Sequence, residues 1–178
     1  MASTLLRHPA RDTVRSDAYR YGALVLFTAT AVILAALGFE HIGGYIPCPL
    51  CLQQRYAYYA GIPLAFLALV MVSSRQHRLA QVLFALIAVA FLINAGLGVY
   101  QAGAEWKFWP GPSSCGTLQA IGGTGHGVLD KLETTKVIRC DEAQWRFAGL
   151  SFAGWNAVIS LLLAIGAVTA SMPARRTR

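Results

Sequence analysis

Four cysteines are the residues whose type and spacing point most directly to chemistry: Cys48, Cys51, Cys115 and Cys140. The first two form Cys-Pro-Leu-Cys, a Cys-x-x-Cys motif in which a disulfide can open to give a reactive thiolate. The other two have 24 residues between them and belong to no second motif of this kind. The pattern favours thiol–disulfide chemistry at the first pair.

The residues that follow the motif indicate how its thiolate would be stabilised. The apolar stretch after Cys51 is expected to form a helix, whose N-terminus stabilises a thiolate through its dipole and unpaired N–H groups. Arg55 lies four residues after Cys51, one helical turn along the same face, and adds positive charge. A thiolate here would be a good nucleophile and a good electron donor. Taken alone, Arg55 is also compatible with an arginine whose head group reaches the membrane surface.

Other uses of the four cysteines lead to different functions. Two structural disulfides are one alternative, although a Cys-x-x-Cys pair closes a tiny loop and adds little stability. A zinc site is a second, but the spacing offers only one Cys-x-x-Cys, so we expect no metal. Haem attachment would need a histidine directly after the second cysteine, where Leu52 stands. Four cysteines allow three disulfide pairings, and the residues alone do not choose between them.

Long uncharged runs must position these cysteines. Hydrophobic residues make up 56% of the chain and charged residues 13%, which is too apolar for an ordinary soluble domain. A bilayer core of ~30 Å needs about 20 helical residues, and lipid offers the backbone no hydrogen-bond partners. We therefore predict an all-α membrane protein, a single antiparallel four-transmembrane-helix bundle with two extracytoplasmic loops. The predicted helices are residues 21–39, 55–72, 79–100 and 149–170, the outer loops 40–51 and 101–146, and the cytoplasmic tails 1–20 and 171–178.

The basic residues indicate how the bundle is oriented in the lipid bilayer. The two tails and the short loop between the second and third helices carry nine arginines against two acidic residues, a net charge of +7. The other side has six basic and six acidic residues, which cancel. The positive-inside rule places both termini in the cytoplasm and all four cysteines on the opposite, oxidising side. The positive charge is thus a topology signal, and no basic surface with interspersed aromatic residues suggests a nucleic-acid partner.

Segments around the cysteines carry a family resemblance. They are residues 39–41 (Phe-Glu-His), 47–55 (Pro-Cys-Pro-Leu-Cys-Leu-Gln-Gln-Arg), 109–115 (Trp-Pro-Gly-Pro-Ser-Ser-Cys) and 140–149 (Cys-Asp-Glu-Ala-Gln-Trp-Arg-Phe-Ala-Gly). The chain resembles the DsbB family of bacterial inner membranes in its cysteine order and loop lengths. It also resembles that family in the arginine four residues after the second cysteine and the tryptophan five residues after the fourth. The resemblance extends from the first helix to the fourth and does not include the tails.

The resemblance to the DsbB family, disulfide bond formation protein B, implies a thiol:quinone oxidoreductase of the bacterial inner membrane with its cysteine loops in the periplasm. A reduced DsbA-like periplasmic thiol oxidase would attack a Cys115–Cys140 disulfide and form a mixed disulfide at Cys115. Cys140 would then attack Cys48, and Cys51 would be released as a thiolate facing a membrane quinone, either ubiquinone or menaquinone. Electrons that leave through the quinone would support disulfide bond formation. The sequence itself agrees with such a division, since one pair lies at the bilayer edge and the other on a long loop that a soluble protein can reach.

Residues near the motif are candidates for the quinone site that the resemblance implies. Arg55 would place positive charge beside the quinone oxygen as it is reduced. Trp145 and Phe147 could form a wall of the head-group site, and His41, with Glu40 beside it, could relay protons. The alternatives are aromatic residues of the interfacial belt and, for His41, a contact with lipid head groups.

Competing interpretations come from one related and one unrelated class. Proteins similar to vitamin K epoxide reductase also use four helices to pass electrons from thiols to quinone, but there the Cys-x-x-Cys follows the loop pair, whereas here it precedes it. A DsbB-like paralogue with one dedicated partner is also compatible with the sequence. A non-catalytic membrane scaffold with two structural disulfides would have cysteines that resist mild reductant and no bound quinone.

Overall fold

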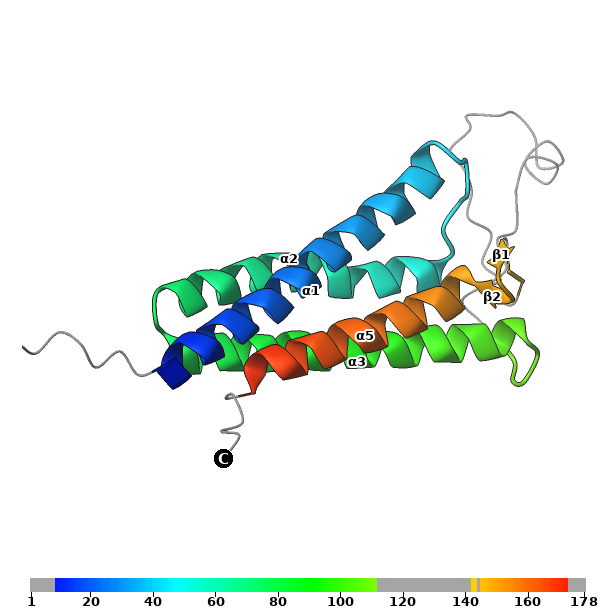
Figure 1. Ribbon diagram of the computed structural model, residues 1–178. Coiled ribbons are helices and arrows are strands. Elements are labelled where there is room, and N and C mark those ends of the chain that lie inside the picture. The colour runs from blue at the N-terminus through cyan, green and yellow to red at the C-terminus, as the bar shows by residue number, and fades with distance from the viewer. Residues whose placement is uncertain (1–8, 112–141, 144, 173–178) are drawn as a thin grey trace, which may run out of the picture.

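In the part of the chain that the structure describes, four long helices form a bundle with a small two-stranded sheet at one end (Figure 1). The computed structural model describes residues 9–111, 142–143 and 145–172. Within these residues, four helices are long and apolar enough to cross a membrane, which confirms the predicted four-helix membrane bundle. The elements are α1 (Pro9–His41), α2 (Pro49–Ser73), α3 (His77–Glu105), β1 (Arg146–Phe147), β2 (Leu150–Ser151) and α5 (Phe152–Ser171).

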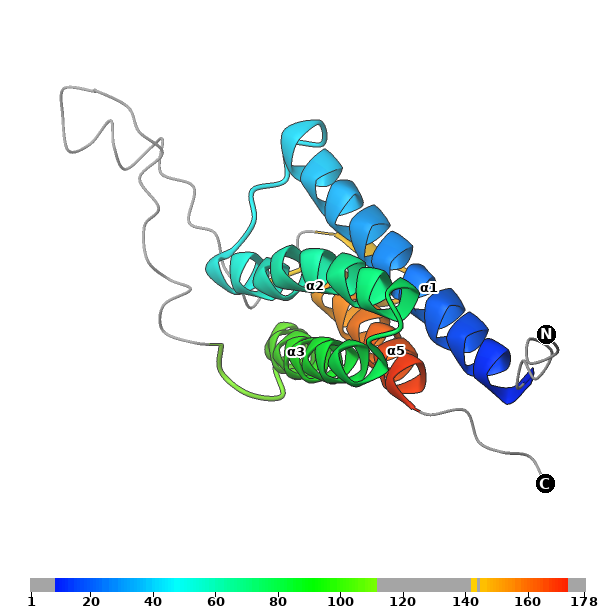
Figure 2. The same ribbon diagram turned by 90° about the vertical axis from the view of Figure 1, so that its left-hand side faces the viewer.

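Successive helices run in opposite directions, so α1 and α3 end where α2 and α5 begin (Figures 1 and 2). We call this the disulfide end of the bundle, because it holds the Cys48–Cys51 disulfide. α3 packs against α2 on one side and α5 on the other, whereas α1 crosses α2 and α5 and diverges from the bundle toward the disulfide end (Figures 1 and 2). The antiparallel order thus gathers the first turns of α2 and α5 and the last turns of α1 and α3 around one site.

The outward-facing side chains are those expected of a protein surrounded by lipid. Phe27 is 72% exposed, and Leu162 and Ile93 are each 62% exposed. A soluble monomer rarely leaves such a belt of large apolar side chains uncovered. All four helices contribute to the interior, and the largest fully buried side chains in it are Phe84 and Phe91 of α3. Hydrocarbon chains around the bundle account for the exposed residues, because lipid is as apolar as the side chains that meet it.

The first three helices extend beyond their predicted ranges at both ends. α1 begins at Pro9, twelve residues before the predicted start, and α3 extends to Glu105, five residues past its predicted end. α2 begins at Pro49, six residues early, so the Cys-x-x-Cys motif forms its first turn instead of belonging to the outer loop. The predicted ranges followed uncharged runs, but a helix continues through charged turns wherever its backbone N–H groups remain paired. Proline at the first helical position and a capping side chain at Cys48 favour the early start of α2.

The sheet at the disulfide end was not predicted, and it shortens the last helix. β1 and β2 pair antiparallel, with Arg146 opposite Ser151. The turn residues Ala148 and Gly149 have φ values of 51° and 82°, the positive values that a two-residue hairpin requires. Ser151 then caps α5 by accepting a hydrogen bond from the N–H of Gly154 at 3.2 Å. α5 therefore starts at Phe152 and not at the predicted residue 149.

Small residues allow α3 and α5 to approach closely beneath the site. A Cβ atom added to Gly98 would lie 3.0 Å from the carbonyl oxygen of Ala153 and 3.0 Å from the Cβ of Ala157. Such close contact between backbones is typical of helix pairs in membranes, where packing and not the hydrophobic effect drives association.

Replacing Gly98 with valine is expected to destabilise the bundle by about 1–3 kcal/mol, because the added carbons overlap a backbone that cannot move alone. Gly96 is the matched control: it lies one half-turn away on the same helix, and a Cβ there meets nothing within 4 Å. Thermal unfolding in detergent would check this, with Gly98→Val lowering the midpoint and Gly96→Val leaving it nearly unchanged. Equal midpoints for the two variants would contradict the proposed close packing of α3 and α5.

Candidate functional site

The centre of the site is the disulfide between Cys48 and Cys51, whose Cα atoms are 5.0 Å apart. Cys48 is the N-cap of α2, and its sulfur accepts a hydrogen bond from the N–H of Cys51 at 3.1 Å. Cys48 is only 3% exposed, whereas Cys51 is half-buried and faces a cavity. The structure therefore places the two cysteines at a helix N-terminus, as predicted. The N–H groups of the first turn of the helix point toward the two sulfurs.

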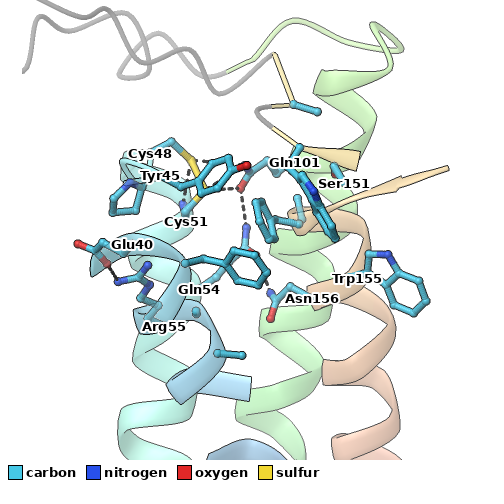
Figure 3. A pocket seen from close by; sticks show the side chains of 18 of the residues that line it. Glu40, Tyr45, Cys48, Cys51, Gln54, Arg55, Gln101, Ser151, Trp155 and Asn156 are labelled. Carbon is cyan, nitrogen blue, oxygen red and sulfur yellow. Dashed lines mark hydrogen bonds and ion pairs between the residues drawn. A yellow bond between two sulfur atoms is a disulfide. The ribbon is translucent and has the colours of Figure 1, made fainter. Parts of the chain in front are cut away.

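A glutamine from the last turns of α3 reaches both sulfurs. The amide nitrogen Nε2 of Gln101 lies 3.3 Å from Sγ of Cys51 and 3.4 Å from Sγ of Cys48 (Figure 3). Gln101 is buried, and so is Glu105 one turn later, whose Oε1 is 3.5 Å from the same nitrogen. Within the described part of the chain, the other oxygen of Glu105 has no hydrogen-bond partner. The disulfide thus has polar groups of α3 on one side, although most of the other side chains around it are apolar.

Arg55 forms an ion pair with Glu40 across the gap between α2 and α1 (Figure 3). Their side chains are 13% and 25% exposed, so the pair is largely removed from water. Both residues line the cavity beside the disulfide. The charge of Arg55 is consequently shared with a carboxylate at the cavity wall, while the groups in direct contact with the sulfurs are the Gln101 amide and the first turn of α2.

A cavity of about 270 Å³ opens beside the disulfide, between the end of α1 and the first turns of α2 and α5. Its walls are mainly apolar, with a polar edge formed by the disulfide, Arg55 and Gln101. It lies where α1 diverges from the other helices (Figure 1). Such a site offers a flat, apolar molecule a place to bind with its polar atoms toward the sulfurs.

Four aromatic rings form one wall of this cavity. Trp145 stacks on Phe152 with ring centroids 4.8 Å apart, and Phe39 meets Phe152 edge-on at 5.2 Å. Tyr45, from the connection between α1 and α2, meets Phe39 at 6.1 Å. These rings come from separate parts of the chain, so their packing holds the end of α1, the residues before β1 and the start of α5 together.

The residues predicted from the sequence to form the site do not all reach the cavity. Glu40, Arg55 and Trp145 line it together with the two cysteines. Phe147 is 60% exposed and stacks on Trp145 from outside, with ring centroids 5.7 Å apart. His41, the last residue of α1, is exposed and is not among the residues that line the cavity.

Cys115 and Cys140 lie outside the described residues. The disulfide between them that the resemblance implies therefore remains a prediction, and so does the expected absence of a zinc site built from all four cysteines. Among the residues that the structure does describe, no group of three or more histidine, cysteine, aspartate or glutamate side chains is arranged to hold a metal ion.

Several polar residues inside the bundle were not predicted from the sequence to belong to the site. They occur as pairs four residues apart on three helices, and i, i+4 spacing places both members of each pair on one helix face. This spacing is the signal that could have identified a shared polar interior. The pairs are Gln54 and Tyr58 on α2, Gln101 and Glu105 on α3, and Asn156 and Ser160 on α5.

Comparisons with known proteins agree on one family. The family model described as disulfide bond formation protein DsbB matches residues 19–170, most of the chain. The chain is 30% identical over 162 residues to "Disulfide bond formation protein B" of Xanthomonas oryzae pv. oryzae (strain MAFF 311018), covering 89% of this chain and 94% of that protein. It is 29% identical to the protein of the same name from Acidovorax sp. (strain JS42), covering 80% and 82% of the two chains. No solved structure matches the chain.

Proposed function

Because the chain belongs to the DsbB family of disulfide bond formation proteins, we propose that it is a protein-dithiol:quinone oxidoreductase that reoxidises a periplasmic DsbA-type thiol oxidase. The observation that carries this proposal is the position of the Cys48–Cys51 disulfide, at the wall of an apolar cavity at one end of a membrane bundle. A disulfide with a purely structural role has no need of such a cavity beside it.

The cavity fits the head group of a membrane quinone, ubiquinone or menaquinone. Its volume of about 270 Å³ is slightly below the ~300–1,000 Å³ that is usual for sites that hold a whole drug-sized ligand. A head group would fill it while the isoprenoid tail stays in the bilayer. Aromatic walls suit a planar ring, and the edge near Arg55 and Gln101 offers donors to its oxygens. When bound, the quinone would supply an acceptor for two electrons and two protons.

In this proposal the cysteines carry the electrons in steps that leave the chain unchanged at the end. The partner's thiolate attacks Cys115, and Cys140 leaves as a thiolate. Cys140 then bonds to Sγ of Cys48 while the Cys48–Cys51 bond breaks, and the electron pair of that bond stays on Cys51. Attack of the partner's second thiol on the mixed disulfide frees Cys115, and attack of Cys115 on Cys140 frees Cys48.

At that point Cys48 and Cys51 hold the two electrons that the partner lost. Their disulfide re-forms when these electrons leave, and the partner has exchanged two thiols for one disulfide. The two protons lost by the partner's thiols equal the two that a quinone takes up. Because Cys48 is only 3% exposed, its attack by Cys140 requires the groups that cover its sulfur to move aside.

The remaining site residues act through the cavity in this proposal. Arg55 stabilises negative charge on the quinone oxygen, and Glu40 holds the guanidinium in place. Trp145 forms part of the wall, and Phe147 supports Trp145 from behind. His41 would pass protons between this end of the bundle and water, because it is exposed at the end of α1 beside Glu40.

We propose the bacterial inner membrane as the location, with both termini in the cytoplasm and the disulfide end facing the periplasm. The net charge of +7 on the side of the two tails supports this orientation.

Turnover with purified components tests the proposed function. The protein in detergent would be mixed with a reduced DsbA-type oxidase and a short-chain quinone, and quinone absorbance followed without oxygen. We expect quinone loss that requires both the protein and the oxidase, with one partner disulfide formed for each quinone consumed. An unchanged quinone together with an oxidase that stays reduced would favour the scaffold with two structural disulfides.

A further inference from the structure

Four polar side chains form a continuous hydrogen-bonded chain from the middle of the bundle to the disulfide. The hydroxyl of Tyr58 on α2 donates to Oδ1 of Asn156 on α5 at 2.6 Å. Nδ2 of Asn156 donates to Oε1 of Gln54 at 2.5 Å, and Nε2 of Gln54 donates to Oε1 of Gln101 at 2.7 Å. Gln101 then presents its Nε2 to the sulfurs of Cys48 and Cys51 at 3.4 and 3.3 Å (Figure 3).

Every donor in this chain points toward the disulfide. The direction is set at the sulfur end, because disulfide sulfurs carry no hydrogen and can only accept. If the Gln101 amide were reversed, its oxygen would face two sulfurs and Oε1 of Glu105, all of which have lone pairs. The orientation of Gln101 in turn selects the orientation of Gln54, and Gln54 selects that of Asn156. The chain is therefore a row of aligned dipoles whose positive end meets the sulfurs.

The surroundings make this alignment effective. Tyr58, Gln54 and Gln101 are 3%, 5% and 3% exposed, so little water competes with the hydrogen bonds. In such a medium electrostatic interactions are stronger than in water, and hydrogen bonds in a row polarise one another. A neutral disulfide sulfur is a weak acceptor, whereas a thiolate is a charged one, and hydrogen bonds to charged groups are the stronger kind.

We propose that Gln101 is a thiolate-binding residue of the Cys48–Cys51 pair, and that Gln54, Asn156 and Tyr58 are positioning residues that hold its N–H group toward the sulfurs. This role rests on the proposed function, in which Cys140 bonds to Cys48 and the electron pair of the broken bond stays on Cys51. The Gln101 amide is already 3.3 Å from that sulfur, so the new charge meets an oriented donor without rearrangement. The chain thereby favours the opened state of the pair.

The alternative is that these residues only join helices, which is the usual role of amides inside membrane bundles. Asn94 provides a matched control for this purely structural role. Its Nδ2 donates to Oγ of Ser160 at 2.9 Å, so it also links α3 to α5 through a buried hydrogen bond. Ser160 is in turn hydrogen-bonded to Tyr58 and Asn156, so Asn94 reaches the chain only at the end far from the sulfurs. Asn94 does not contact the sulfurs, and it is not among the residues that line the cavity. A purely structural role predicts similar effects of removing Asn94 and Gln101.

The test is the redox equilibrium of the Cys48–Cys51 pair against glutathione, measured by alkylation and mass spectrometry without quinone or partner. The full chain would carry Cys115→Ser and Cys140→Ser, so that only this pair reacts. Gln101→Met keeps the length of the side chain and removes its donors, and Gln101→Glu keeps its shape but puts oxygen in place of nitrogen. We expect Gln101→Met to shift the equilibrium toward the disulfide by about tenfold, or ~30 mV, and Gln101→Glu to shift it further.

Two further variants separate binding from packing. Gln54→Leu should shift the equilibrium in the same direction by a smaller factor, and it should add nothing in a Gln101→Met background, because Gln54 acts through Gln101. Asn94→Leu should leave the equilibrium where it is in the wild type. The proposal is overturned by a wild-type equilibrium in Gln101→Met and Gln101→Glu, by an equal shift in Asn94→Leu, or by additive effects of Gln54→Leu and Gln101→Met.

The outcome is independent of the proposed electron acceptor. The equilibrium with glutathione requires neither quinone nor the thiol oxidase, so a failure of turnover with quinone would leave this measurement intact. Conversely, a failed Gln101 prediction would leave the thiol:quinone reaction standing and remove only the role of the hydrogen-bonded chain.

Discussion

The Cys51→Ser variant is expected to lose quinone reduction with every thiol donor, by roughly 10³-fold or more. Both cysteines line the cavity, and Cys51, the more exposed of the two, is the sulfur from which the electrons leave in the proposed reaction. A hydroxyl cannot form the Cys48–Cys51 disulfide or take its place as an electron donor. The measurement is anaerobic quinone absorbance, first with a reduced DsbA-type oxidase and then with dithiothreitol as the electron source.

Cys115→Ser gives the informative contrast. It should block electron transfer from the protein dithiol while leaving dithiothreitol-driven quinone reduction largely intact, because a small thiol reaches the Cys48–Cys51 pair directly. The two variants thus separate the acceptance of electrons from their delivery to the quinone. If Cys51→Ser still reduced quinone with dithiothreitol, the assignment of Cys51 to the quinone side would be wrong.

The Arg55→Leu variant is expected to reduce quinone about 10²-fold more slowly, with little change in the rate at which the partner dithiol reacts at the chain. The substitution removes the positive charge at the cavity wall and leaves the Glu40 carboxylate, 25% exposed, without its partner. Both effects work against negative charge on a quinone oxygen. The measurement is kcat/KM for quinone set against kcat/KM for the reduced oxidase, in the same preparation.

Two conservative variants distinguish charge from packing at Arg55. Arg55→Lys keeps the charge but not the planar group that pairs with a carboxylate, so it should retain part of the activity. Glu40→Gln keeps a hydrogen-bond acceptor for Arg55 and removes the negative charge, so it should lower activity far less than Arg55→Leu. An unchanged dependence on quinone concentration in Arg55→Leu would remove Arg55 from the quinone site.

The sequence was sufficient for the architecture because lipid imposes a simple rule. Every uncharged run long enough to span the bilayer had to be a helix, and the described residues contain four such helices. The same rule misplaced the helix ends, since it follows side-chain charge and not backbone hydrogen bonds. The first turn of α2 shows the consequence: Pro49 and the cap at Cys48 start the helix at the motif itself.

The site was predictable only where a local pattern carries it. The Cys-x-x-Cys motif and Arg55 one turn later are visible in eight consecutive residues, and the structure places both at the cavity. Gln101 depends on the register of α3 against α2, which no local pattern gives, and its predicted helix ended one residue before it. The same limit explains Phe147, whose backbone lies in an unpredicted hairpin that turns its ring outward against Trp145.

Family membership argues against a protein similar to vitamin K epoxide reductase. A relative of vitamin K epoxide reductase would not have matched a DsbB model from residue 19 to residue 170. The quinone, the partner oxidase and the pairing of Cys115 with Cys140 are all parts of our proposal.

The most direct test of the central claim is a single turnover of the isolated pair. Protein carrying Cys115→Ser and Cys140→Ser would be reduced, freed of reductant and mixed without oxygen with one equivalent of a soluble quinone. Our account predicts that about one equivalent of quinone is consumed and that peptide mapping finds Cys48 and Cys51 joined again. Unchanged quinone, with both thiols still open to alkylation, would contradict it.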